Sequence, residues 1–460
     1  MASLDLSIVN VAFPALERTF THDSPSVLSW VLTGYSIVFG SLLVVAGRTA
    51  DRLGARRIFF AGLGVFCFGS LLCAVAPSVA LLIAGRAVQG VGAAAVLPSS
   101  LGLLLGAFSV ERRSQVVAMW GGIGALAVAT GPSLGAALIT AFSWRAAFYV
   151  NLPVGLVAWL MGRRVLVESR ALTNSKSSGP DYPGVFLLGG ALATLVLAIS
   201  QGPSWGWTHP RVFGALALSL VLGVLFIIRS AHHDEPVLDL RLFRARSFSV
   251  ANAAVLAYSM GFFAMLLGNI LFLTSVWHYS ILEAGLSVTP GPIVVALVSG
   301  PAGRLASRVG FRPVLLAGSA IFAGGLVWYA AVIGGAADYP GRWLPGTLVV
   351  GLGIGLTFPV LSAAAVASLE PSRYSVGSAV NQTARQIGGA LGVAILVVVV
   401  GTPTSARMAL EHFRHLWIFS AAMAVLSGLT CTQLRRPATT KTNADLTNSL
   451  SVSAKTREAD

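Results

Sequence analysis

The chain has 460 residues, of which 55% are hydrophobic and only 10% are charged. Soluble domains carry about 25% charged residues, so this composition excludes an ordinary globular protein and indicates a membrane protein. The net charge of +14 does not indicate nucleic-acid binding, because the basic residues are dispersed in short loops between apolar segments.

Fourteen apolar segments approach or reach the length of about 20 residues that a spanning helix needs. The sequence therefore predicts an all-α integral membrane protein with fourteen spans, the first of them short. The predicted spans cover residues 4–20, 29–47, 58–76, 79–106, 116–140, 147–166, 183–201, 211–229, 248–273, 284–303, 313–335, 344–368, 375–400 and 416–434.

The distribution of lysine and arginine predicts the orientation of these spans. With the N-terminus inside the cell, 23 basic residues fall in cytoplasmic loops and six fall outside, and Arg86 and Arg385 lie within spans. Positive charge collects on the cytoplasmic side of membrane proteins, so both termini are expected in the cytoplasm. The use of 28 arginines and only three lysines, with abundant alanine and glycine, suggests a bacterial source. We therefore expect a multi-pass protein of the bacterial plasma membrane.

The spans and polar segments divide the chain into four parts. Residues 1–166 form a predicted six-helix bundle, and residues 248–434 form a second one. Between them, residues 167–247 hold a polar, turn-rich linker and a two-helix insert. Residues 435–460 are rich in threonine, asparagine and serine, and we expect a disordered cytoplasmic tail.

A short basic sequence occurs once in each half of the chain, flanked both times by spans. The first copy is GRTADRLGARR at 47–57, and the second is GRLASRVGFR at 303–312, with Ser307 in place of Asp51. A charged loop that is repeated in two halves of a membrane chain indicates a duplicated transporter. The conspicuous residues of the first copy are Gly47, Arg48, Asp51, Arg52, Gly54, Arg56 and Arg57.

Several further strings, taken with this loop, carry a resemblance to a known family. They are LDLSIVNVAFP at 4–14, WVLTGY at 30–35, RAVQGVG at 86–92, GPSLG at 131–135, and Trp144, Arg145, Phe148, Asn151, Pro153 and Gly155. Together with the six-plus-two-plus-six layout, they resemble the fourteen-helix drug:proton antiporter branch of the major facilitator superfamily.

The resemblance implies a fold of two six-helix bundles with a two-helix insert. It also implies proton-coupled export of amphipathic small molecules by alternating access. Such a protein is not an enzyme, and its partners are the substrate, protons and the lipid bilayer. We expect a monomer that needs no cofactor beyond the proton motive force.

Asp5 and Arg86 are the candidate residues for proton coupling. A carboxylate in a span costs about 2.5 to 3.5 kcal/mol on insertion scales, and such residues usually serve transport. In the family, the arginine of the 86–92 motif is tied to proton coupling, which the resemblance carries to Arg86. The alternatives are a solvated Asp5 at the cytoplasmic end of its helix, and an Arg86 whose side chain extends to the outer interface.

The first loop copy and the fifth span carry two further candidates. By resemblance, residues 47–57 form a conformational gate; the alternative is a basic loop that only fixes topology. In the fifth span, small residues recur at steps of three and four, which allows close approach of a neighbouring helix. The resemblance links Gly131, Pro132 and Gly135 to export and to sealing against leakage.

Polar and aromatic residues within spans are candidates for a substrate cavity. Tyr35 and Gln89 are the candidates in the first half, and Asn381, Gln382 and Arg385 form a polar face in the second. That face predicts either a cavity lining or a hydrogen-bond network between helices. The aromatic candidates are Tyr35, Phe39, Trp120, Tyr258, Phe262, Phe263 and Phe358.

The sequence also argues against other function classes. It has no nucleotide-binding loop, no nucleophile-elbow motif and no metal-ligand spacing, so we expect neither ATP hydrolysis nor a metal site. An uptake permease of the same fold remains an alternative, as does a membrane receptor that does not transport.

The first span is expected to be incomplete. From Leu4 to Phe20 is 17 residues, or about 25 Å of helix against a hydrocarbon core of about 30 Å. The missing part is the cytoplasmic half, which we expect to be needed to bury Asp5. This predicts that the natural product begins upstream of Met1, or that this form is impaired.

Overall fold

The structure is a computed structural model, and it describes residues 1–108, 127, 130–166, 181–234, 236–367, 369 and 374–434. Within these ranges every regular element is helical. The predicted all-α membrane fold is confirmed. The predicted disordered tail at 435–460 and most of the linker at 167–180 lie outside the described residues.

The helices of the first half follow the predicted spans closely. They are α1 (Ala2–Thr19), α2 (Pro25–Leu28), α3 (Trp30–Leu53), α4 (Ala55–Ala74), α5 (Val79–Ala107), a helical segment at 130–141, α7 (Ala146–Tyr149) and α8 (Asn151–Val165). The insert consists of α9 (Tyr182–Trp205) and α10 (Pro210–His232), followed by the short 3₁₀ helix η2 (Leu240–Arg244).

The second half repeats this order of long helices. They are α11 (Arg246–Ser275), α12 (Ile281–Val288), α13 (Pro290–Val309), α14 (Phe311–Val332), η3 (Tyr339–Trp343), α15 (Leu344–Val366), α16 (Tyr374–Val400) and α17 (Ala406–Cys431).

Among the described residues, eleven helices are long and apolar enough to cross a membrane. The three other predicted spans coincide with α1, the segment at 130–141, and α7 with α8. Helix α1 has 18 residues and carries Asp5, Glu17 and Arg18, so its length and composition alone do not mark it as a span. The count of fourteen therefore stays a prediction.

Two predicted boundaries were wrong. The last span was predicted from residue 416, but α17 begins at Ala406, where the Ser405 side chain accepts a hydrogen bond from the Met408 amide. Its first turns are polar, so hydropathy missed them. The predicted span 284–303 begins earlier, at Ile281, and is divided into α12 and α13 at Thr289 and Pro290.

The two copies of the basic loop adopt the same turn. Gly54 joins α3 to α4 with φ 104°, and Gly310 joins α13 to α14 with φ 91°. Side chains other than glycine rarely adopt this backbone conformation. The repeated glycine is thus the residue that allows each helix to end and the next to begin immediately.

Close helix packing is also repeated in the two halves. A Cβ atom on Gly92 of α5 would collide with Phe66 of α4, and one on Gly353 of α15 would collide with Phe322 of α14. Small residues let membrane helices approach each other, and this approach replaces the hydrophobic drive that lipid does not supply. Both contacts involve the same pair of neighbouring helices within their half.

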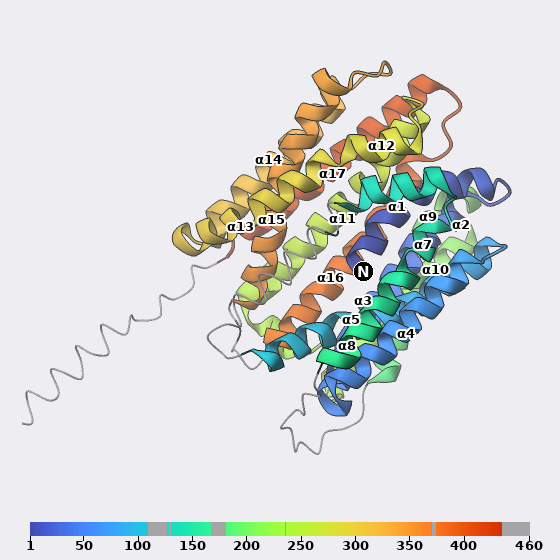
Figure 1. The fold of residues 1–460 in the computed structure, drawn as a ribbon. Helices are drawn as coiled ribbons and strands as arrows, with labels where there is room; N and C mark the ends of the chain where they lie inside the picture. The colour runs from blue at the N-terminus through green and yellow to red at the C-terminus, as the bar shows by residue number, and fades with distance from the viewer. Residues whose placement is uncertain are drawn as a thin grey trace, which may run out of the picture.

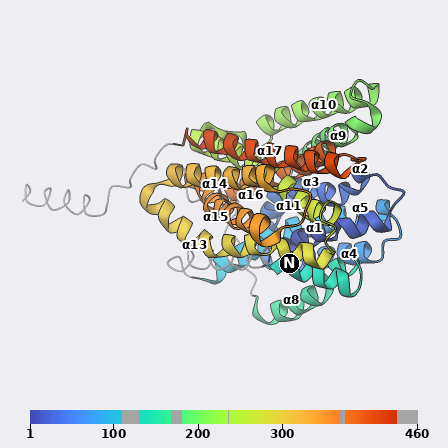
Figure 2. The same cartoon turned by 90° about the horizontal axis from the view of Figure 1, so that it is seen from above.

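The insert packs between the two halves at the edge of the bundle (Figures 1 and 2). Helices α9 and α10 contact each other, and α9 also contacts α3 of the first half and α16 of the second. Helix α3 also packs directly against α16. The outer helix α10 keeps most of its apolar surface exposed, as expected for a helix that faces lipid. The division of the chain into four parts remains a proposal.

Candidate functional site

A cluster of polar side chains is sealed inside the first half, where α1, α5 and α8 meet. The Arg86 Nη1 atom donates to Oδ2 of Asp5 at 2.6 Å, so the two side chains form an ion pair. Oδ1 of Asp5 accepts bonds from Gln89 at 2.8 Å and from Asn151 at 2.9 Å. The carboxylate therefore has three donors, contributed by two other helices.

Other groups bind Arg86, although its buried Nη2 atom has no hydrogen-bond partner among the described residues. Its Nε atom donates to the Val31 carbonyl at 2.9 Å, and Nη1 also donates to Oε1 of Gln89 at 2.5 Å. The guanidinium carbon lies 4.0 Å from the ring centroid of Tyr35, within cation–π range. Gln89 in turn donates to the hydroxyl of Ser70 at 2.7 Å. The charge of Arg86 is thus balanced by one carboxylate, one ring face and one carbonyl.

Local sequence explains how these side chains meet. Arg86 and Gln89 are three residues apart on α5 and therefore share a helix face. Gly69 and Gly85 allow α4 to approach that helix, because a Cβ atom on either would collide with Gln89 or Cys73. Without these two glycines, the polar groups of α4 and α5 would be held too far apart to share one network.

The structure contradicts both alternative interpretations of the charged pair. Asp5 and Arg86 are each 0% exposed, so Asp5 is not solvated and Arg86 does not extend to the outer interface. The expectation that upstream residues are needed to bury Asp5 was also wrong. Figure 1 marks the start of the chain at about mid-height of the bundle, and Met1 is only partly exposed.

The predicted gating loop lies at the end of α3 and the start of α4. Gly47, Arg48, Arg52 and Gly54 belong to α3 and its cap, and Arg56 and Arg57 begin α4. Arg56 donates to the Arg163 carbonyl at 3.4 Å and lies over the Phe60 ring. The four arginines all have interaction partners. The Asp51 side chain lies outside the described part, so its predicted role is untested.

The 131–135 motif packs against both halves of the protein. A Cβ atom on Gly131 would collide with Ser7, and one on Gly135 would press on Ile8, so both glycines allow α1 to lie close. The Pro132 carbonyl faces Gly285 of α12 in the second half. The predicted stripe of small residues is therefore a contact surface that α1 and α12 share.

The polar face of α16 is divided between two roles. The Asn381 side chain donates to Asn252 of α11 at 3.2 Å, so this residue belongs to a hydrogen-bond network between helices. Arg385 is partly buried, and its Nη2 atom donates to Ser362 of α15 at 2.9 Å. Its guanidinium carbon lies 4.3 Å from the Phe358 ring centroid. Gln382 lies on the same helix and is partly exposed.

The predicted aromatic cavity residues fall into two groups. Tyr35 and Phe39 are packed in the first half and are at most 2% exposed. In the second half the Phe358 ring centroid lies 4.9 Å from that of Phe262 and 5.1 Å from that of Tyr258. The Phe263 ring centroid lies 5.2 Å from that of Phe262. Trp120 lies outside the described residues.

Sequence reasoning did not assign Asn151 and Ser70 to the charged cluster. Asn151 was noticed only as part of a family string, and Ser70 is an unremarkable polar residue in an apolar span. A single signal was available: an amide at the first position of α8, where an apolar residue would have been cheaper to bury. Neither position shows which partner it meets until α1 is placed.

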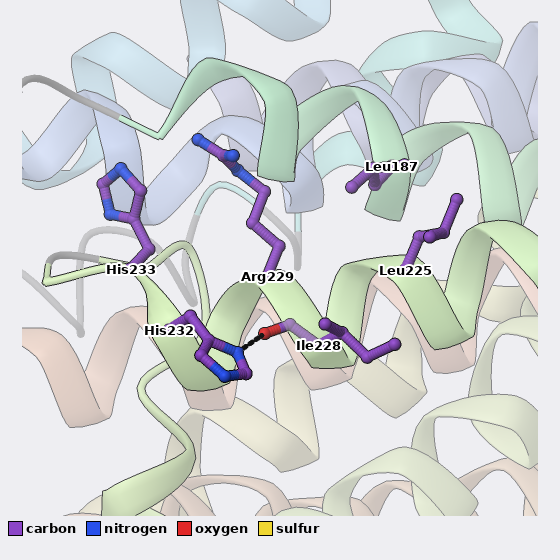
Figure 3. Close-up of a pocket in the computed structure, with 6 residues that line it drawn as sticks. All are labelled: Leu187, Leu225, Ile228, Arg229, His232 and His233. Atoms are coloured by element: carbon purple, nitrogen blue, oxygen red, sulfur yellow. Dashed lines mark hydrogen bonds between the residues drawn. The ribbon is translucent and has the colours of Figure 1, made fainter.

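Two hollows on the surface are unlike this cluster. The first, about 420 Å³, is lined by α9 and α10 residues of the insert: Leu187, Leu225, Ile228, Arg229, His232 and His233 (Figure 3). Two of its polar side chains, Arg229 and His232, already have partners within the protein. Arg229 donates to Asp181 at 2.5 Å, and the His232 Nδ1 atom lies 2.7 Å from the Ile228 carbonyl. The second hollow, about 520 Å³, lies along α13.

Asp181, at the start of α9, links the two helices of the insert through its bond with Arg229 of α10. Burial raises its pKa, but the hydrogen bonds from Arg229 and the Gly184 amide outweigh that cost, so the pKa lies below its ordinary value. The carboxylate is thus held in its charged form. This contact is structural, since Asp181 lies outside the central polar cluster.

The fold and the sealed charge pair define a polytopic membrane transporter, and three comparisons agree. The sequence model of the Major Facilitator Superfamily matches residues 1–393 and 250–456. A multidrug resistance protein B homolog of Mycobacterium tuberculosis is 35% identical over 405 residues, covering 87% of this chain and 74% of the relative. A methylenomycin A resistance protein of Streptomyces coelicolor is 32% identical, covering 87% and 83%.

The fold comparison gives the same class. A crystal structure of an auto-inhibited POT family peptide transporter aligns with a TM-score of 0.65, covering 96% of this chain and 99% of that one. Its sequence is only 16% identical, so it shows the fold alone. On these findings, the chain belongs to the major facilitator superfamily.

Proposed function

We propose that this protein exports amphipathic small molecules from the cell in exchange for protons. The observation that carries the proposal is the Asp5–Arg86 pair, a carboxylate sealed at 0% exposure with its counter-charge in a membrane bundle. The names of the relatives, which include multidrug resistance and antibiotic resistance proteins, support an exporter. Fourteen spans and both termini in the cytoplasm complete the proposed arrangement.

Proton binding to Asp5 supplies the conformational signal. Protonation removes the negative charge that pairs with Arg86, and the arginine cannot release its own proton. The cluster then holds one uncompensated positive charge in a low-dielectric interior, which favours a rearrangement of the helices that meet there. Protonation also weakens the hydrogen bonds that Asn151 of α8 and Gln89 of α5 donate to the same carboxylate oxygen, so both helices are affected directly.

The driving force sets a bound on export. One elementary charge moved through 100 mV is worth about 2.3 kcal/mol. One proton exchanged for one neutral molecule therefore sustains a gradient of roughly fiftyfold from the voltage alone.

Asp5→Asn tests the proposal in inside-out vesicles that carry an imposed pH gradient. We expect transport of a panel of fluorescent amphipathic dyes to disappear, because an amide cannot carry the proton. Asp23→Asn, in the loop after α1, is the matched control and keeps transport. Wild-type transport in Asp5→Asn vesicles would overturn the proposed coupling, and uptake in right-side-out vesicles would indicate a permease.

The loop at 47–57 is proposed as the gate of this cycle. Asp51→Asn is expected to slow turnover severalfold with little change in substrate binding, because a latch acts on the exchange between conformations. Ser307→Ala in the second copy, which lacks the acid, serves as the control. A large loss of equilibrium binding with unchanged turnover would contradict the gating role.

A further inference from the structure

The second half contains a positive charge, Arg385, that no acidic side chain of the described residues balances. Arg385 lies near the middle of α16, and within the described part of the chain only Ser362 accepts a hydrogen bond from its side chain. Its Nε atom is buried and has no partner there. The ion pairs of the described residues involve Asp5, Asp181, Asp338 and Glu411, and none of them includes Arg385.

An unbalanced arginine inside a membrane bundle is costly, and it cannot become neutral. The Phe358 ring stabilises one face of the guanidinium, but a ring face carries no net charge. A guanidinium has five N–H donors in a planar fork that fits carboxylates, and most of these donors are unused here. Among the described residues, the guanidinium thus has one neutral acceptor and one ring face but no anion.

The side chains near Arg385 indicate what the remainder of an anionic ligand would be. The Phe358 ring, which faces the guanidinium, lies 4.9 Å from the Phe262 ring between centroids, at an interplanar angle of 89°. Phe262, Phe358, Gln382 and Arg385 are all partly exposed, in contrast to the fully buried Asp5 and Arg86. These side chains offer aromatic faces and a neutral amide next to one positive charge.

We propose that Arg385, Phe358 and Phe262 form a substrate subsite for an amphipathic organic anion. The ligand class is an aromatic molecule that carries a carboxylate or an ionised phenol, with the ring on the phenylalanines and the anion on the guanidinium. This inference adds a substrate class to the export function proposed above, and it rests on that proposed function.

The charge of the substrate changes the energetics of export. Exchange of one proton for one monovalent anion moves two charges down the membrane potential, whereas exchange for a monovalent cation moves none. At 100 mV, two charges sustain a gradient of roughly two-thousandfold, against about fiftyfold for a neutral molecule. Transport of the proposed ligand class is therefore strongly electrogenic.

Binding of a matched pair of probes tests the subsite. The probes are 2-naphthoate and its neutral amide, measured at equilibrium on the purified full-length protein with no proton gradient. We expect the wild type to prefer the carboxylate, and Arg385→Gln to weaken carboxylate binding roughly ten- to hundredfold, as for loss of a charge-assisted bond. Amide binding stays within about twofold.

Two further variants keep the test decisive. Arg385→Lys retains the charge without the planar fork, so its carboxylate affinity falls between those of the wild type and Arg385→Gln. Arg414→Gln is the matched control, because Arg414 is also partly buried, binds one carbonyl and has an unbonded Nε among the described residues. Equal loss of both probes in Arg385→Gln, or equal binding of both by the wild type, would overturn the subsite.

Failure of this subsite is distinguishable from failure of the exporter. Loss of selective binding in Arg385→Gln does not require a working proton cycle, since the measurement is made at equilibrium. If Asp5→Asn still transports but the carboxylate preference depends on Arg385, the proposed coupling is wrong and the subsite stands. If Asp5→Asn stops transport but Arg385→Gln leaves the preference unchanged, only the subsite is wrong.

Discussion

Arg86 and Arg385 are the two arginines that the sequence places within predicted spans, and their surroundings differ. Arg86 is fully buried and pairs with Asp5 at 2.6 Å, whereas Arg385 is partly buried and meets no carboxylate in the described part of the chain. Each also lies close to an aromatic ring, at 4.0 and 4.3 Å from the ring centroid. The difference separates a charge that an acidic side chain balances from one that has no acidic partner among the described residues, which we propose a ligand supplies.

The same difference explains why we expect different roles for Arg86 and Arg385. A balanced pair responds to loss of one charge, so it suits proton coupling. An unbalanced cation responds to arrival of an anion, so it suits recognition. The two loop copies repeat the asymmetry in sequence, since the acid of the first copy is replaced by Ser307 in the second.

Removal of Asp5 is expected to have the largest effect. Asp5→Ala leaves Arg86 as an uncompensated buried charge, and the free energy of unfolding should fall by about 3–5 kcal/mol. The double variant Asp5→Ala/Arg86→Met removes both charges and should recover most of that stability without recovering transport. Thermal unfolding in detergent measures the first effect, and vesicle transport measures the second. A double variant as unstable as the single one would show that the pair does not balance the charge.

Arg86 substitutions are expected to have a graded effect on transport. Arg86→Ala should lose transport more completely than Arg86→Lys, because lysine keeps the charge but not the fork that binds Asp5, Gln89 and the Val31 carbonyl together. Initial rates of dye export measure both variants beside the wild type. Equal activity in all three proteins would remove Arg86 from the mechanism.

Arg385→Gln is expected to behave in the opposite way for stability. Removal of a charge that has no acidic partner among the described residues should leave the free energy of unfolding unchanged or raise it by about 1 kcal/mol, in contrast to the loss expected for Asp5→Ala. Thermal unfolding without ligand measures this, with Arg414→Gln as the control. A decrease of several kcal/mol in the free energy of unfolding would mean that Arg385 is balanced within the protein, which would contradict the contrast with Arg86.

The insert offers a smaller, pH-dependent effect. The pKa of Asp181 lies below its ordinary value, so its contribution to stability is complete above about pH 4 and disappears as the pH falls through the lower folded value. Asp181→Asn should cost about 1 kcal/mol at pH 7, because Arg229 is 34% exposed and the bond is partly screened.

The control is Asp338→Asn, which removes an exposed pair with Arg342 at 3.2 Å and should have almost no effect. Unfolding midpoints between pH 3 and pH 7 measure both variants. A penalty for Asp181→Asn that grows as the pH falls would contradict the assigned direction.

Hydropathy was sufficient to predict most of the helices. Most of the described helices from α3 to α16 lie where apolar length placed them. Errors occurred where a helix begins with polar residues, as at Ala406, or where a span divides at a proline, as at Pro290. A resemblance in short strings was sufficient to predict the superfamily, which the comparisons confirm. These features depend on residues that are close together in sequence.

The sequence by itself determined the membrane class, the helices, the repeated glycine turns and the identity of the charged residues within spans. Only the tertiary structure decided which charges meet. Asp5 and Arg86 are 81 residues apart, and Asn151 is 146 residues from Asp5, so no local pattern could indicate that they share one carboxylate. The physical reason is that a charge within a membrane is stabilised by partners that other helices bring to it, and their arrangement depends on packing. The same packing leaves Arg385 beside the Phe358 ring and, among the described residues, without an acidic partner.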